Sequence, residues 1–256
     1  MRAVFAIVSA MMRELIRKKD VYVLFIFLIV LLTILACQNF FQIEGISRYV
    51  RDFGYTAVMF FSFIIAVTFT ARQIPAEIEA RTIYPLLAKP LSRYTLIFSK
   101  FCGGAVVSVL CFILFFTVYG LFCFFGVEGV DPVLFVQGLI FGILCLCLVS
   151  ALVVFLSTFM TLSANVTVSF LLFMLINGFS GPLRNTVLLT RGIASSAAGV
   201  VYYLLPHFDF YDLRIRITHA WDPLPMWLIF SVTAYTVFYC FMLLFFAGAI
   251  FRRKRL

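Results

Sequence analysis

The side chains best suited to chemistry lie together in the last third of the chain. The two histidines, His207 and His219, are found there, close to Asp209, Asp212 and Asp222. Imidazole and carboxylate groups bind metals or transfer protons, but two neutral imidazoles with no recognised spacing specify little. Ordinary surface residues are the favoured interpretation, so the sequence predicts no catalytic residue and no metal site.

The motifs of common catalytic sites are absent from the sequence. It contains no G-x-x-x-x-G-K-[ST] phosphate loop, and its only glycine pair, Gly103 and Gly104, lies in an apolar stretch. It contains neither H-E-x-x-H nor G-x-S-x-G. We therefore expect a chain that is not an enzyme and that leaves any ATP hydrolysis to a partner.

The composition indicates an integral membrane protein. Apolar residues make up 64% of the chain and charged residues only 12%, whereas a soluble domain carries about a quarter charged residues. Because backbone polar groups cannot stay unpaired in lipid, the predicted fold class is all-α. The net charge of +9 has an explanation in membrane topology, and no nucleic-acid partner is predicted.

Charge-free runs predict six transmembrane helices, since a crossing needs about 20 apolar residues. One run is about twice that length and has a polar break at 161–167, so we divide it into two. The stretch 192–205 is too short for a crossing and suits a re-entrant or interfacial outer segment before the last helix. The five runs are 21–38, 53–71, 101–127, 132–183 and 226–251.

Most of the lysines and arginines lie in residues 1–20, 72–100 and 252–255. The positive-inside rule places these segments, and therefore both termini, in the cytoplasm, which requires an even number of crossings. We expect a multi-pass protein of the inner (cytoplasmic) membrane with one transmembrane domain, 1–256. The interiors of the predicted spans lack ionisable residues, which disfavours an ion-driven carrier.

Two cytoplasmic segments have more than a basic charge. Apolar residues recur at helical spacing in 1–20, which predicts an amphipathic helix at the membrane interface; a simple basic flank is the alternative. In 72–94, Pro75 suits the first turn of a helix whose positive end favours Glu77 and Glu79. This short charged helix has the form of a docking element, although an ordinary connecting loop fits as well.

The sequence "EIEARTIYPLLAKPLSR" resembles the permease subunits of type-2 ABC transporters, and more narrowly the permease branch of the nitrous-oxide-reductase maturation system. The resemblance implies an N-terminal elbow helix (1–20), a cytoplasmic coupling segment (72–94) and an extracytoplasmic loop (182–225). In the loop, "YYLLPHFDFYDLR" resembles a family motif and contributes Pro206, Phe208, Asp209 and Asp212. The residues implied to couple to an ATPase are Glu77, Glu79, Arg81, Leu86, Leu87, Lys89, Pro90 and Arg93.

What the resemblance implies is a subunit of an exporter. A separate ABC ATPase, present in two copies, would bind ATP and Mg²⁺ and drive export or movement of a substrate, while this chain holds no cofactor. A second copy of the chain or a related permease would complete the membrane part, in contact with lipid. The alternative is a membrane-embedded enzyme or scaffold subunit without transport, which would depend on the His207 and Asp209 region.

Overall fold

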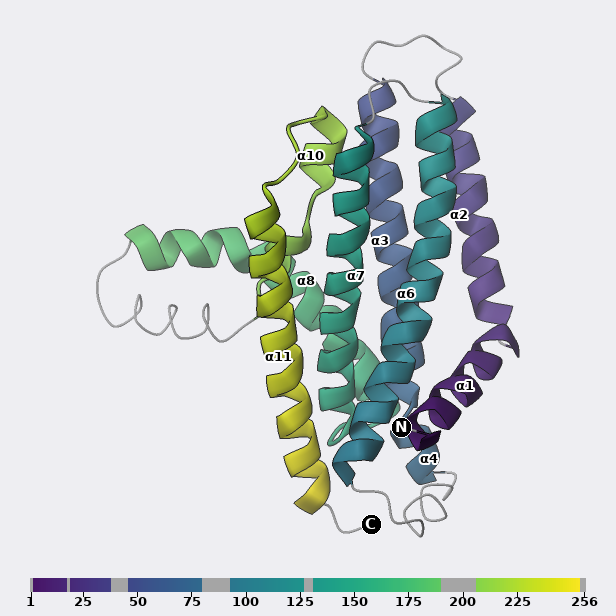
Figure 1. Cartoon of the computed structure of the whole chain (residues 1–256), viewed down its shortest axis with the longest axis vertical. Helices are drawn as coiled ribbons and strands as arrows, with labels where there is room; N and C mark the ends of the chain where they lie inside the picture. The colour runs from purple at the N-terminus through teal and green to yellow at the C-terminus, as the bar shows by residue number, and fades with distance from the viewer. Residues whose placement is uncertain are drawn as a thin grey trace.

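The computed structural model describes residues 2–17, 19–37, 46–79, 93–126, 131–189 and 206–253, and all their regular structure is helical (Figure 1). The prediction of an all-α protein is confirmed. In chain order the elements are α1 (Arg2–Arg17), α2 (Lys19–Cys37), α3 (Ile46–Arg72), α4 (Pro75–Glu79), α6 (Arg93–Gly126), α7 (Pro132–Ser157), α8 (Leu162–Leu189), the 3₁₀ turn η2 (Phe208–Tyr211), α10 (Arg214–His219) and α11 (Met226–Arg253).

Four helical stretches within the described residues are long and apolar enough to cross a bilayer: 51–79, 93–124, 132–157 and 226–253. Two further apolar helices are shorter, at 22–34 and 162–175. The multi-pass membrane character is therefore supported, and the count of six crossings stays a prediction.

The structure places three boundaries more closely than the sequence did. Helix α3 begins at Ile46 and α6 at Arg93, so both extend beyond the charge-free runs into charged sequence. The long run 132–183 is interrupted between Ser157 and Leu162, at the edge of the predicted break. Figure 1 shows that the later part of α8 turns away from the bundle.

Helix α3 lies at the centre of the bundle, with α2, α6, α7 and α8 against it. Glycines let large side chains fit between the helices, and Gly138 and Gly142 of α7 form a G-x-x-x-G pattern, which favours close packing. A Cβ on Gly142 would lie 2.2 Å from the ring of Phe112, which is fully buried. These helices are therefore held together by close packing at glycine positions.

The two ends of the bundle differ in charge. At one end lie α1, α4, the start of α6 and the end of α11, and we name this the basic end (Figure 1). At the opposite end, which we name the α10 end, lies the segment 206–225 that contains α10. The first residues of α1 and the last residues of α11 lie at the same end of the bundle (Figure 1).

Some predicted features lie outside the described residues. Of the coupling segment 72–94, residues 80–92 are among them, including Arg81, Leu86, Leu87, Lys89 and Pro90. The re-entrant or interfacial stretch 192–205 is also outside. The predictions for residues 80–92 and 192–205 therefore stay predictions.

Candidate functional sites at the two ends of the bundle

At the basic end, α3 passes into α4 through a turn of two residues. The amide of Gln73 donates to the carbonyl of Thr70 at 3.2 Å, and Ile78 N donates to Ile74 O at 3.1 Å. Helix α4 then begins at Pro75, which needs no N–H partner in the first turn. The short helix is therefore joined directly to the central helix of the bundle.

Helix α4 is fixed to α6 by an ion pair between Glu77 and Lys100. The Lys100 side chain is 4% exposed and that of Glu77 is 25% exposed, so water screens the pair only weakly. Removing one partner of a buried pair is costly because the other charge stays buried without compensation. The pair therefore holds α4 in one position against the start of α6.

An apolar cluster at the basic end joins four helical regions. Burying these side chains together excludes water from the joint between α4 and the bundle. The fully buried members are Ile74 from the turn before α4, Leu96 and Ile97 from α6, Val154 from α7, and Ala247 and Phe251 from α11.

Arg93, the first residue of α6, binds the end of α11. Its guanidinium donates to the carbonyls of Phe251 and Arg252, both at 3.0 Å, and lies 6.0 Å from the centre of the Phe251 ring. The last carbonyls of a helix have no partner within the helix, and a cation there also complements the helix dipole. Arg93 is thus a cap supplied from another helix.

Helix α1 also contacts α6 close to Lys100. Met11 and Leu15 of α1 are buried, and a Cβ on Gly103 would lie 2.1 Å from the Met11 sulfur. On the adjacent position, Gly104 makes room for Thr70 of α3. Successive turns at the start of α6 therefore contact α11, α4, α1 and α3.

The structure brings together only part of the predicted coupling set. Glu77 and Arg93 both contact the start of α6 or the end of α11, whereas Glu79 is exposed. Lys100 was not among the predicted site residues, although it is the partner of Glu77. The signal in the sequence was its position at the start of the apolar span that follows "EIEARTIYPLLAKPLSR", which is part of the resemblance to type-2 permeases.

At the α10 end, the predicted motif residues divide into two groups. Pro206 and Phe208 are buried, whereas Asp209 and Asp212 are exposed. The Asp212 carboxylate accepts a hydrogen bond from the amide of Arg214 at 2.9 Å and so satisfies a donor at the start of α10. Asp212 therefore has a local role at the start of α10, and Asp209 lies on the surface of the segment.

Neutral hydrogen bonds hold the same segment against α11. The Tyr211 hydroxyl lies 2.7 Å from the Thr236 hydroxyl, and the His207 amide donates to the Tyr235 hydroxyl at 2.9 Å. Burial raises the pKa of Tyr211 above its ordinary value, so this hydroxyl keeps its proton at physiological pH. The contact between Tyr211 and Thr236 is therefore insensitive to pH near neutrality.

Gln137 of α7 forms a pair of hydrogen bonds to the backbone of Leu224. Its side-chain amide donates to Leu224 O at 2.9 Å and accepts from Leu224 N at 2.8 Å. Gln137 is buried. The backbone directly before α11 is thus the partner of this buried polar side chain.

The histidines and aspartates of this segment do not converge. His207 stacks on Phe210, with ring centres 5.3 Å apart, and His219 stacks on Trp221 at 5.9 Å. In the part of the chain that the structure describes, no three His, Cys, Asp or Glu side chains are placed to hold a metal ion. The geometry offers no support for the enzyme alternative at this end.

Residues 5–188 match the family model described as ABC-2 family transporter protein. The match covers more than half of the chain, so the chain belongs to this family of ABC transporter permeases. A comparison with curated protein sequences gives no match. The matched residues include α4 and α6, and they end before the segment 206–225.

Proposed function

We propose that this chain is the transmembrane subunit of an ABC exporter and works with a separate ATPase that binds at the basic end. The basic end then faces the cytoplasm, in the inner membrane, and the partner binds ATP and Mg²⁺. Family membership supports the permease role. The sequence has no phosphate loop, which supports a division of work between two subunits.

The observation that carries this proposal is the buried pair between Glu77 and Lys100. It joins α4, which leads into the segment 80–92 with the family resemblance, to the start of a long membrane helix. A force applied to α4 is therefore passed to α6 through the pair and to α3 through the connecting turn. Glu79, exposed on the same short helix, is free of that structural task and suits direct contact with the ATPase.

Two finer points belong to the same proposal. A symmetric pair of ATPases offers two docking sites, which a homodimer of this chain fills by two-fold symmetry. The exposed aromatic side chains of α11, such as Phe230, Phe238 and Phe241, suit contact with lipid, and an amphiphilic substrate suits such surroundings. The narrower nitrous-oxide-reductase branch rests only on the residues that resemble it.

The test is co-expression with ABC ATPases from the same organism, followed by purification of the complex and assay of ATP hydrolysis. We expect Glu79→Gln to weaken ATPase binding with little effect on thermal stability, because its side chain is exposed. We expect Glu77→Gln to lower stability and the stimulation of hydrolysis together. Asp222→Asn, an exposed carboxylate at the α10 end, is the matched control and is expected to leave ATPase binding unchanged. A chain that forms no complex with the ATPase overturns the proposal.

A further inference from the structure

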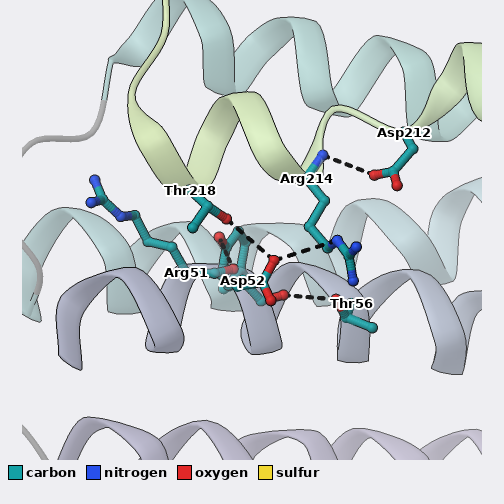
Figure 2. Close-up of polar contacts among 7 residues, drawn as sticks. Arg51, Asp52, Thr56, Asp212, Arg214 and Thr218 are labelled. Atoms are coloured by element: carbon teal, nitrogen blue, oxygen red, sulfur yellow. Dashed lines mark hydrogen bonds and ion pairs between the residues drawn. The ribbon is translucent and has the colours of Figure 1, made fainter. Parts of the chain in front are cut away.

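The α10 end of helix α3 contacts α10 through Asp52 (Figure 2). The Asp52 carboxylate oxygen Oδ1 lies 3.4 Å from Arg214 Nε and accepts a hydrogen bond from the Thr218 hydroxyl at 3.4 Å. Arg214 and Thr218 are four residues apart and therefore on one face of α10. A single carboxylate of α3 thus holds both ends of that face.

Local contacts make α10 a well-defined unit. Asp212 caps its first turn, and Ala220 ends it with a left-handed backbone at φ 49° while its amide donates to Arg216 O. Between the two contacts with Asp52, Ile217 is buried and lies in the space left by Gly138 of α7. The short helix is therefore seated on α3 and α7 together.

Further polar attachments of the segment 206–225 lead to other helices. Gln137 belongs to α7, and Tyr235 and Thr236 belong to α11. Asp52 of α3 contacts two residues of α10, Arg214 and Thr218. It therefore provides a polar attachment of α10 to α3 that a single substitution can remove.

We propose that Asp52 is a positioning residue that makes α10 follow α3, so that a displacement delivered at α4 reaches the opposite end of the bundle. Helix α3 runs without a break from Asp52 to Arg72 and is separated from α4 by two residues. Such a helix transmits axial motion over about 30 Å, at 1.5 Å per residue. This inference rests on the proposed function.

The exposure of the contact makes it suitable for a test. The side chains of Arg214 and Asp52 are 39% and 41% exposed. A substitution here leaves no fully buried charge, so the bundle is expected to fold normally. An effect of Asp52→Asn is then an effect on the attachment of α10 and not on the core.

The experiment uses the complex with the ATPase, reconstituted in liposomes, with Ile215→Cys as a labelling site on α10. Ile215 is 50% exposed, and the chain without this substitution gives the background from native cysteines. The rate of modification by a water-soluble maleimide is compared without nucleotide and with ATP and vanadate. We expect a change of about fivefold or more, the lower end of usual coupling between sites.

Asp52→Asn is expected to abolish this nucleotide-dependent change, and Asp52→Glu to retain it. Arg214→Gln tests the same contact from α10 and is expected to act like Asp52→Asn. Asp222→Asn, at an exposed carboxylate of the same segment, is the control and is expected to change nothing. ATP hydrolysis is measured in each variant.

The outcomes separate the two proposals. A complex that hydrolyses ATP without any response at position 215 overturns the role of Asp52 and leaves the proposed function standing. A response that persists in both Asp52→Asn and Arg214→Gln also overturns the role of Asp52. A chain that assembles with no ATPase overturns the proposed function and this inference together.

Discussion

An ion pair lies near each end of helix α3, and the two pairs differ in burial. At the basic end, Glu77 of α4 pairs with Lys100, whose side chain is 4% exposed. At the α10 end, Asp52 pairs with Arg214, and both side chains are about two-fifths exposed. Removing one partner of a buried pair costs much of the folding free energy, because the other charge stays buried. An exposed pair contributes little to that free energy, because water solvates both charges.

At the α10 end, where the ion pair is weak, several other residues also attach the segment 206–225 to the bundle. Gln137, Tyr211 and His207 add neutral hydrogen bonds to two other helices, so the loss of one leaves the rest. We call the attachment at the basic end the firm joint, because its ion pair is buried. We call the attachment at the α10 end the adjustable joint, because its ion pair is exposed and its other contacts are distributed. The predictions that follow test this difference.

The largest effect is expected from Glu77→Ala. The substitution leaves the Lys100 ammonium buried without its partner, which costs about 3 kcal/mol of folding free energy. The measurement is the thermal or chemical unfolding midpoint of the purified chain in detergent micelles.

The control for this effect is the double substitution Glu77→Leu with Lys100→Met. With both charges removed, apolar side chains of similar size fill the site, and the stability is expected to return close to that of the original chain. If Glu77→Ala leaves the midpoint unchanged, the basic end is not the firmer joint.

Gln137→Leu is expected to have the next largest effect, at the α10 end. It removes two hydrogen bonds and leaves the amide and carbonyl of Leu224 unpaired, which costs about 2 kcal/mol. The unfolding midpoint measures the cost, and hydrogen exchange of the Leu224 amide locates it. Faster exchange confined to the segment 206–225 supports distributed attachment, whereas exchange throughout α7 argues against it.

The fold class was predictable because it depends on composition. Apolar runs and the need to pair every backbone group in lipid lead directly to membrane helices. The specific contacts between side chains were harder to predict from the sequence. The structure pairs Glu77 with Lys100, 23 positions away, whereas Arg81, which is one helical turn from Glu77, lies outside the described residues.

Charges at the ends of apolar runs account for most of what the sequence missed. Asp52 and Lys100 each stand one residue outside a predicted span, where a charge is usually interpreted as a boundary. The structure places both within longer helices and gives each a partner from a distant segment. Spacing along the chain carries no information about such pairs, since they depend on how helices pack.

Arg93→Gln is expected to have a moderate effect at the basic end. The guanidinium donates to two carbonyls at the end of α11, and hydrogen bonds from a charged group contribute about 1.5 kcal/mol. The unfolding midpoint is expected to fall accordingly, with increased exchange in the last turn of α11. Arg253→Gln, an exposed residue of the same turn, is the control; an equal effect would assign the loss to surface charge alone.

The smallest effect is expected from Asp131→Ala, at the start of α7 near the α10 end. The Asp131 carboxylate accepts from the amide of Val133 at 2.9 Å and caps the helix, with Pro132 at the first helical position. Loss of an N-cap costs about 1 kcal/mol, and Asp131→Asn, which keeps the acceptor, is expected to restore most of it. A cap acts within its own helix, so this cost is independent of how either end is attached to its neighbours. If Asp131→Ala lowers the unfolding midpoint as much as Glu77→Ala does, then burial of the ion pair is not what distinguishes the basic end, and the contrast between a firm and an adjustable joint fails.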